Sequence, residues 1–391
     1  MKKLIILLLA FASIGIAQPN RHRVRPPQFM SVYNGTNAYY SKTNPVGMDL
    51  NGAERLANPT FNADTSSWVV ANGSMATSTV QKHAGAKSCL LVASAANASI
   101  TSETITDATT DKGTGETWAW VGLTASTKSI KLVLLDQAGA TIDSTVTTCT
   151  GATWTKLVKN KQWAGTQTGL KLRAGFNGGA ALDSAYFDDF SLTQAWDGVI
   201  VGIIKTAAAS TQRMLRVTST GTSAYYTEVT SGGAIILPLT SETGNATTLT
   251  SASTALADGK WHIIIGKMQR DGNAQWYIDG VADATTQSLA GIGKIVGTNQ
   301  IYLGWNTGAA YFNGYLGEQQ FIRGTFTAAQ LASMAADAYN RFRSNRSLSS
   351  SYAGMNSMSW YDWKSGGLDR GTNGNNLTPS GGVYITRKPR N

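Results

Sequence analysis

The sequence contains little cysteine, little histidine and few charged residues, and these shortages exclude several classes of protein. Two cysteines and three histidines in 391 residues are too few for a zinc site with the usual number of ligands. No phosphate-binding loop, Ser–His–Asp order or histidine-rich metal motif is present. After the first 17 residues, no segment is apolar enough to span a bilayer.

Glycine, threonine, serine and alanine are abundant instead. The chain has 41 glycines, 42% hydrophobic residues and only 14% charged residues, and it is too apolar for a disordered protein. This composition favours many short strands and turns over helices. A length of 391 residues allows two domains, each with its own core. We therefore expect a two-domain protein made mainly of β-strands.

The first 17 residues have the pattern of a secretory signal peptide. Two lysines precede the apolar run Leu4–Ala12, and the small residues Gly15 and Ala17 follow it. We expect cleavage between Ala17 and Gln18, and since no cysteine follows the cut, no lipoprotein anchor is expected. The alternative is an uncleaved membrane anchor. Cleavage predicts a secreted protein, extracellular or at the cell surface, or on the virion surface if a phage encodes it.

The formal charge of +10 lies mainly at the two ends of the chain. Residues 18–28 contain three arginines, and residues 341–391 contain eight basic and two acidic residues, whereas the body between them is close to neutral. A nucleic-acid groove would be lined by basic residues within the fold, so no nucleic-acid partner is expected. Basic ends suit solubility, or contact with an anionic envelope, a polysaccharide or a neighbouring subunit.

Residues 258–281 have the pattern of a hairpin in a sheet that is covered on at least one side. Three Asp-Gly pairs, at Asp258, Asp271 and Asp279, mark turns around two apolar runs. Alternation in the first run predicts one face with Trp261, Ile263 and Ile265 and another with His262, Ile264 and Met268. The motif Asp-Gly-x-Trp-His, followed by Tyr-x-Asp-Gly, resembles the central hairpin of laminin-G-like, concanavalin A-like sandwiches. The resemblance implies an all-β, concanavalin A-like β-sandwich in which Trp261 and His262 serve packing.

Five short segments of a different kind occur between residues 56 and 195. They are LANPTFNADTSSWVV from Leu56, HAGAKSCLLV from His83, WAWV from Trp118, WTKL from Trp154 and AYFDDFSL from Ala185. In this order they are similar to the galactose-binding-like jelly rolls found among carbohydrate-binding modules. The resemblance implies a complete β jelly-roll domain.

The jelly roll interrupts the concanavalin A-like pattern. Residues 29–50 contain FMSVYNGTNAYY and resemble an early strand pair of the laminin-G-like sandwich, but the next strand of that family, WDGVIVGIIKT, begins only at Trp196. We infer that the jelly roll is inserted into the sandwich, because the first and last strands of a jelly roll lie close together. The alternative is two consecutive domains, with residues 29–50 as a separate arm.

The predicted divisions follow from this insertion. They are a signal peptide (1–17), a basic arm (18–28), a discontinuous laminin-G-like sandwich (29–54 and 196–343), the inserted jelly roll (55–195), a Ser-rich linker (344–359) and C-terminal strands (360–391).

One helix is expected after the last strand of the sandwich. Thr327 and Gln330 form a capping box, and an apolar stripe follows at helical spacing, made of Leu331, Met334, Ala335, Ala338, Tyr339 and Phe342. Beyond the linker, the string from Asp369 to Thr378 resembles the usual start of a laminin-G-like domain. The C-terminal strands therefore either complete the sandwich of the same chain or pair with the sheet edge of an identical subunit.

Cys89 and Cys149 fall in the same predicted domain. Export would permit a disulfide between them. The alternative is two buried free thiols.

The sequence offers no pair of carboxylates suited to glycoside hydrolysis. Endoglucanases of the concanavalin A-like fold carry a Glu-x-Asp-x-Glu type run on one strand face, whereas the late strand here has only Glu318. Asp188 and Asp189 are expected to point to opposite faces of a strand. We therefore expect no catalytic residues and no enzyme activity, with a glycoside hydrolase as the alternative.

Asp188 is a candidate metal ligand by resemblance. In related carbohydrate-binding modules the first Asp of the motif Tyr/Phe-x-Asp-Asp/Asn binds a structural calcium ion together with main-chain oxygens. The resemblance implies the same role for Asp188, with main-chain ligands near Lys87. The alternative is a carboxylate that accepts hydrogen bonds from backbone amides. No other cofactor is expected.

Aromatic side chains are the candidate sugar-binding groups, because they stack on the apolar face of a sugar ring while amides and carboxylates bind its hydroxyls. Several tryptophans lie in strand patterns and are expected to pack in the cores, namely Trp68, Trp118, Trp120, Trp154, Trp261 and Trp276. Trp163, Trp305 and Tyr311 lie among small and polar residues and are expected to be exposed. Asn306 and Asn313 complete the predicted ligand-binding set as polar contacts.

Three functions remain, in order of preference. The first is a secreted, non-catalytic, adhesin-like protein that binds a polysaccharide or cell-surface glycan at a bacterial or phage surface. The second is a structural or decoration subunit of a virion or extracellular assembly that uses lectin-like folds for protein contacts. The third is a polysaccharide-degrading enzyme.

Overall fold

The computed structural model describes residues 30–34, 39–43, 51, 54–105, 112–122, 127–151, 153–162, 169–219, 223–242, 244–297, 299–304, 311–344, 356–361, 378–380 and 384–386. The predicted signal peptide and basic arm lie outside these residues, as do most of the predicted linker and the candidates Trp163, Trp305 and Asn306. Within the described part of the chain, no helix has the length and apolar character needed to cross a membrane.

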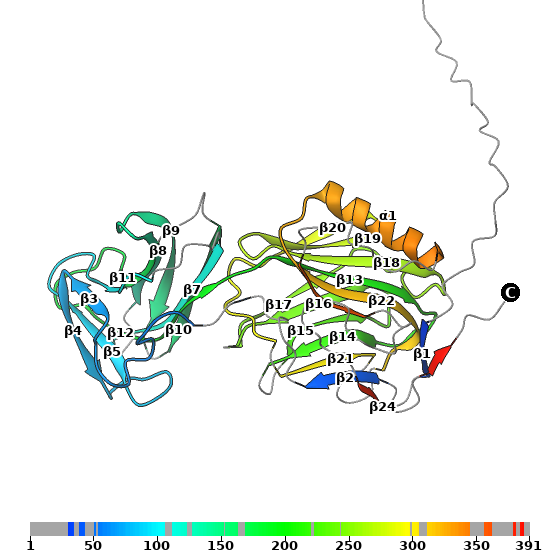
Figure 1. Ribbon diagram of the computed structural model, residues 1–391. Coiled ribbons are helices and arrows are strands. Elements are labelled where there is room, and N and C mark those ends of the chain that lie inside the picture. Colours follow the sequence, from blue (N-terminus) through cyan, green and yellow to red (C-terminus); the bar gives the residue numbers. More distant parts are fainter. Residues whose placement is uncertain are drawn as a thin grey trace, which may run out of the picture.

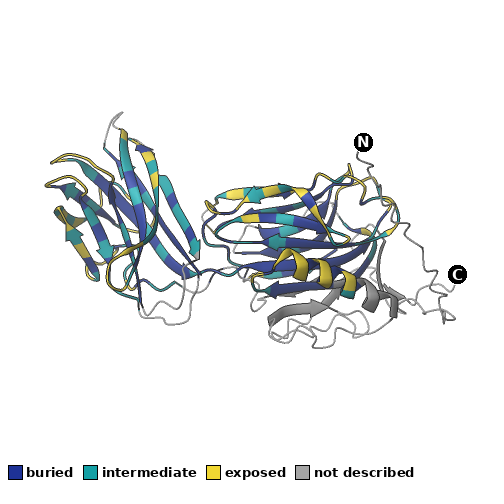
Figure 2. Cartoon of the chain, turned by 90° about the horizontal axis from the view of Figure 1, so that it is seen from above, coloured by how far each residue is buried: buried dark blue, intermediate teal, exposed yellow. Residues whose placement is uncertain are grey.

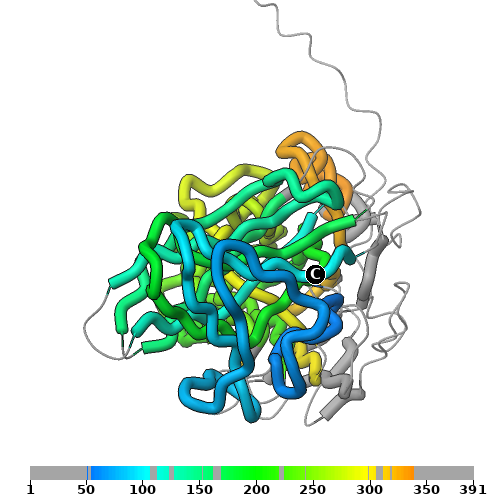
Figure 3. Tube along the Cα trace, turned by 90° about the vertical axis from the view of Figure 1, so that its left-hand side faces the viewer, coloured from blue at the N-terminus to red at the C-terminus, as the bar shows by residue number. Residues whose placement is uncertain are grey.

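The protein consists of two β-sandwiches that lie side by side (Figure 1). Each sandwich has two antiparallel sheets with buried residues between them, and the exposed residues lie in loops and on outer surfaces (Figure 2). When the left-hand side of Figure 1 faces the viewer, the smaller sandwich lies in front of the larger one (Figure 3). The predicted all-β fold class is confirmed.

The smaller sandwich is the jelly roll. One of its sheets has the strand order β10-β7-β12-β5-β4 and the other β3-β6-β11-β8-β9. Alternate residues of these strands fill the core, among them Leu91, Ala119, Leu172 and Phe187, which are all fully buried. The strands are β3 (Trp68–Ala71), β4 (Gly73–Ser78), β5 (Ser88–Ala93), β6 (Ser99–Ser102), β7 (Lys112–Val121), β8 (Thr127–Asp136), β9 (Thr141–Thr150), β10 (Thr155–Gln162), β11 (Leu170–Phe176) and β12 (Ser184–Gln194).

Cys89 and Cys149 are buried in the jelly-roll core as free thiols. The disulfide considered from the sequence is not formed, and the two thiols lie on β5 and β9, which belong to opposite sheets. Burial raises the pKa of Cys89 to about 12 and that of Cys149 to about 11, since each thiolate would lose its hydration. Both thiols are therefore expected to be unreactive at neutral pH.

The larger sandwich also has two sheets. One has the strand order β20-β19-β18-β13-β22-β1-β25, and β23 pairs with β22 in addition. The other has the order β17-β16-β15-β14-β21-β2-β24. Its strands are β1 (Met30–Asn34), β2 (Tyr39–Thr43), β13 (Gly198–Lys205), β14 (Gln212–Thr218), β15 (Ser223–Val229), β16 (Ile235–Thr240), β17 (Ala246–Thr250), β18 (Trp261–Met268), β19 (Asn273–Ile278), β20 (Val281–Ser288), β21 (Gln300–Leu303), β22 (Asn313–Arg323), β23 (Asn356–Tyr361), β24 (Thr378–Ser380) and β25 (Tyr384–Thr386).

The chain leaves the larger sandwich after β2 and returns to it at β13. β1 and β2 pair with β22 and β21, although the whole jelly roll separates them in sequence. Asn51 and Ala195 form an isolated bridge, so the segments that lead into and out of the jelly roll run side by side. Neighbouring ends of this kind allow one domain to occupy a surface loop of another.

The last three strands pair within the same chain. β24 pairs with β2, β25 with β1, and β23 with β22. The predicted linker over 344–359 is too long, because β23 already begins at Asn356. The backbone hydrogen bonds that β22 offers at this point outweigh the weak strand propensity of a serine-rich segment.

The hairpin of residues 258–281 forms β18 and β19, and its predicted faces are confirmed. Ile263 and Ile265 pack in a cluster with the helix α1 (Ala328–Ser344), whereas Ile264 and Met268 face the core between the two sheets. The helix lies across the outer side of this sheet (Figure 1).

The predicted capping box at the start of α1 is also confirmed. The N–H of Thr327 donates to Oε1 of Gln330 at 2.8 Å, and the N–H of Gln330 donates to Oγ1 of Thr327 at 3.3 Å. These two bonds satisfy backbone donors that a helix start leaves unpaired.

Candidate functional site

The outer face of the sheet β10-β7-β12-β5-β4 carries a cluster of aromatic side chains. Along β7, Ala119 and Val121 point into the jelly-roll core and are fully buried. Side chains alternate along a strand, so Trp118 and Trp120 lie on the opposite face. Both are half-buried and belong to neither sandwich core. The sheet thus presents two indole rings outward.

Three further rings lie beside these tryptophans. Tyr186 of β12 is the direct neighbour of Trp120 in the sheet. Trp154, just before β10, meets Trp120 edge to face with ring centroids 5.8 Å apart. His83, between β4 and β5, stacks on Trp118 at 3.9 Å and meets Trp154 at 5.6 Å. We call His83, Trp118, Trp120, Trp154 and Tyr186 the aromatic face.

Two adjacent carboxylates hold His83 in place. Its Nδ1 lies 2.7 Å from Oδ2 of Asp189, and its backbone N–H donates to Oδ2 of Asp188 at 2.9 Å. The expectation that Asp188 and Asp189 point to opposite faces is wrong. A β-bulge shifts the pairing of β12 with β7 between Asp188 and Ser191, and Asp189 has a positive φ of 46°. The bulge places the carboxylates of Asp188 and Asp189 on the same side of the strand, where both contact His83.

The carboxylate of Asp188 is fully buried and accepts hydrogen bonds from backbone amides. The donors are the N–H groups of His83 at 2.9 Å, Ala84 at 3.2 Å and Asp189 at 2.8 Å. Burial and then the nearby charge of Asp189 raise the pKa of Asp188 to about 6. A fully buried carboxylate cannot touch a substrate, so Asp188 and Asp189 do not form a catalytic pair.

The groups around Asp188 do not fit a calcium ion as they are arranged. Calcium takes roughly six to eight oxygen ligands, whereas N–H donors face this carboxylate and Asp189 is engaged by His83. The N–H of Lys87 donates to the side chain of Asn62. Within the described ranges, no group of three or more Asp, Glu, His or Cys side chains could hold a metal. The structure shows the alternative role, in which the Asp188 carboxylate accepts hydrogen bonds from backbone amides. A calcium ion at Asp188 remains a prediction of the resemblance.

The expectation that Trp118, Trp120 and Trp154 pack in a core is wrong. A two-residue period shows that Trp118 and Trp120 share a face, but it does not show which face is inside. The small residues that alternate with them along β7 carry that information, namely Gly113, Gly115, Thr117 and Ala119. A Cβ on Gly115 would lie 2.7 Å from the side chain of Leu172, so the row of small residues in β7 faces the crowded core. This row was the available signal in the sequence.

The other tryptophans assigned to packing are placed as follows. Trp68 and Trp276 are buried in the cores of the jelly roll and the larger sandwich, as expected. Trp261 is half-buried and packs against the cluster under α1.

Two residues of the predicted ligand-binding set lie in the described part of the chain. Tyr311 is half-buried and Asn313 is exposed, at the start of β22 in the larger sandwich. Trp305, Asn306 and Trp163 lie outside the described residues, and their role remains a prediction.

Comparison with known proteins identifies the larger sandwich. Residues 203–332 match the family model described as the concanavalin A-like lectin/glucanases superfamily. The matched segment runs from β13 into α1 of the larger sandwich and includes the hairpin whose motif resembles this superfamily. No curated protein sequence matches the chain.

Solved structures that match parts of the chain include two carbohydrate-binding modules and a pentraxin. The C-terminal family 22 carbohydrate-binding module of Clostridium thermocellum Xyn10B is 16% identical over 35% of this chain and 91% of that chain, with a TM-score of 0.30. The CBM22-1 xylan-binding domain of Paenibacillus barcinonensis Xyn10C is 14% identical over 37% of this chain and 96% of that chain, with a TM-score of 0.31. The heptameric SAP-like pentraxin of Limulus polyphemus is 14% identical over 49% of this chain and 82% of that chain, with a TM-score of 0.34. These similarities are too weak to assign a ligand to this chain.

Proposed function

We propose that the chain binds carbohydrate through the aromatic face of the jelly roll. The observation that carries the proposal is a group of rings on the outer side of a sheet, among which Trp118, Trp120 and Trp154 are half-buried. Sugar rings stack their apolar faces on aromatic side chains, and nearby polar groups bind their hydroxyls. Trp120 and Trp154 supply the ring surfaces, and the exposed imidazole of His83 supplies a polar group.

The rings of the aromatic face are held before any ligand arrives. Nε1 of Trp120 donates to the carbonyl oxygen of Gly122 at 2.7 Å, and Asp189 fixes the ring of His83. A surface that is already ordered loses little side-chain entropy on binding. This rigidity supports a role in recognition.

Trp120→Ala and Trp154→Ala test the proposal. Each variant is measured against xylan, galactan, mannan, mixed-linkage glucan and amylose, by affinity electrophoresis and isothermal titration. Truncating a central aromatic residue of a binding surface costs about 2 kcal/mol, so we expect binding weaker by roughly 30-fold. Trp261→Ala is the matched control, because Trp261 is also half-buried but belongs to the larger sandwich.

Other outcomes would contradict the proposal. If Trp120→Ala and Trp154→Ala bind as the wild type does, the aromatic face is not the site. Loss of binding in Trp305→Ala or Trp163→Ala instead would move the site to the loops predicted from the sequence.

We also propose that the mature protein is secreted, non-catalytic and adhesin-like. The apolar leader supports secretion, the basic ends support contact with an anionic surface, and the burial of Asp188 supports the absence of catalysis. Protein recovered from the medium should begin at Gln18 and should not shorten the polysaccharide it binds. A structural calcium ion at Asp188 rests on resemblance alone, and a melting temperature lowered by EDTA would support it.

A further inference from the structure

The aromatic face occupies only one end of its sheet. Further along β7, Lys112, Thr114 and Glu116 lie on the same face as the two tryptophans, because side chains alternate along the strand. All three are buried, although they lie on the outer side of the jelly roll. The larger sandwich covers Lys112 with Asp197 and Asp271, and it covers Glu116 with Gly293 and Lys294.

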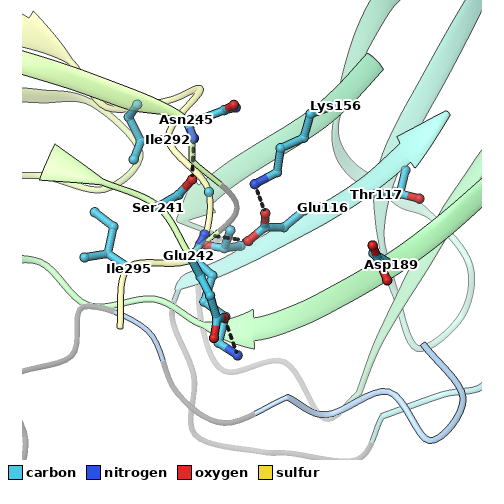
Figure 4. A network of polar contacts seen from close by, with 12 residues as sticks. Glu116, Thr117, Lys156, Asp189, Ser241, Glu242, Asn245, Ile292 and Ile295 are labelled. Carbon is cyan, nitrogen blue, oxygen red and sulfur yellow. Dashed lines mark hydrogen bonds and ion pairs between the residues drawn. The ribbon is translucent and has the colours of Figure 1, made fainter. Parts of the chain in front are cut away.

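The segment 289–295 lies directly against this part of the sheet (Figure 4). The side-chain amide of Asn160, on β10, donates to three carbonyl oxygens of the segment at 2.9 to 3.1 Å. Glu116 accepts a hydrogen bond from the backbone N–H of Lys294. Backbone groups of the larger sandwich therefore bond directly to side chains of the jelly-roll sheet.

Gly293 marks the closest approach of the segment to the sheet. A Cβ at this position would clash with the carboxylate of Glu116 and the ammonium group of Lys156, which form an ion pair. Nζ of Lys156 in turn lies 6.0 Å from the ring centroid of Trp118. The covered part of the sheet thus ends directly beside the aromatic face.

Buried charges hold the segment in this position. Arg270 is fully buried, and its Nη2 donates to two carbonyl oxygens of the segment at 2.7 and 2.9 Å. Lys112 of the jelly roll pairs with Asp197 at 2.6 Å and Asp271 at 2.8 Å. Removing one partner from such a buried network is costly, so the segment is expected to stay on the sheet.

We propose that residues 289–295 act as a stop at one end of the aromatic face, so that the jelly roll binds the ends of glycan chains. The inference rests on the proposed function of the aromatic face. Two residues of a strand span about 7 Å, and this is the distance along β7 from Trp118 to the covered Glu116. The inference takes the glycan to run along β7, over Trp120 and Trp118, so that an internal sugar would have to continue into the space that Gly293 and Lys294 occupy. A terminal sugar needs no room beyond itself and can bind without entering that space.

Chain-end binding predicts how many protein molecules a polysaccharide takes up. The full chain is titrated into xylan, galactan, mannan, mixed-linkage glucan and amylose, and each polymer that binds is partly hydrolysed into samples of equal mass and decreasing length. We expect the number of binding sites per gram to rise in proportion to the number of chain ends. The dissociation constant per site should stay the same.

A number of sites per gram that does not change with chain length would overturn the inference, because it shows binding along internal segments. Failure of the proposed function has a different result. In that case none of the polymers binds, or binding is the same in Trp120→Ala as in the wild type.

Discussion

His262 at the start of β18 shows at the residue scale how carboxylates fix a ring. Its Nδ1 lies 2.9 Å from Oδ2 of Asp279, and its Nε2 lies 3.1 Å from Oδ1 of Asp258. The hydrogen bond with Asp279 is the main cause that raises the pKa of His262, and burial opposes it. The packing role expected for this histidine is therefore partly electrostatic, since the ring joins two turns of the hairpin.

The raised pKa of His262 predicts a pH-dependent stability. Because the folded-state pKa lies above the unfolded value of about 6.5, the stabilisation is complete below that pH and is lost as the pH rises through the folded-state pKa. We expect the wild type to be more stable than His262→Gln near pH 6, and the difference to shrink toward pH 9. Urea unfolding of both proteins over this range measures it. A difference that is constant with pH would refute the explanation.

At the scale of elements, β7 and β12 show what a strand pattern can and cannot predict. The alternation in β7 is visible in the sequence, but the inward face had to be inferred from the size of the residues. The bulge after Asp188 is not visible, because Asp189 adopts a positive φ that depends on the pairing with β7. The His83 contact with Asp189 therefore could not be predicted.

The helix α1 is the element whose start the sequence predicts best. Its capping box depends only on residues three positions apart. Thr327→Ala should therefore remove the hydrogen bond from the N–H of Gln330 without affecting contacts elsewhere in the fold. We expect the free energy of unfolding to fall by about 1 kcal/mol. Chemical denaturation measures it, with Ser333→Ala as the control, because Ser333 is exposed in the same helix. Equal effects of the two substitutions would argue against the cap.

At the scale of the whole molecule, the junction between the two sandwiches is built from buried polar groups. Arg270 is fully buried, and its Nη2 contacts Asn51, which leads into the jelly roll, and Asn160 on β10. Oδ1 of Asn51 also accepts the N–H of Ile295 at 2.9 Å. One side chain thus ties the inserted domain to the domain that carries it.

Arg270→Ala should weaken this junction. Removing one partner of a buried charged network costs about 3 to 5 kcal/mol, because the remaining polar groups lose their partners. We expect a lower unfolding midpoint in urea and faster proteolysis between the two sandwiches. Arg173→Ala is the control, since Arg173 lies half-buried on β11 of the jelly roll. A similar, small effect of both substitutions would show that Arg270 does not hold the junction.

The sequence by itself determined the all-β class, the concanavalin A-like hairpin and the capped helix. Each of these depends on residues close together in the chain, such as the Asp-Gly turns at Asp258 and Asp279 or the pair Thr327 and Gln330. Only the tertiary structure decided the aromatic face and its closed end. Trp120 becomes an outward ring because the opposite side of β7 is filled by the other sheet, and Gly293 reaches that strand only through the docking of a distant domain. The small residues of β7 indicate which face of that strand is inside, but the contact with Gly293 depends on packing between segments far apart in sequence, which no local pattern encodes.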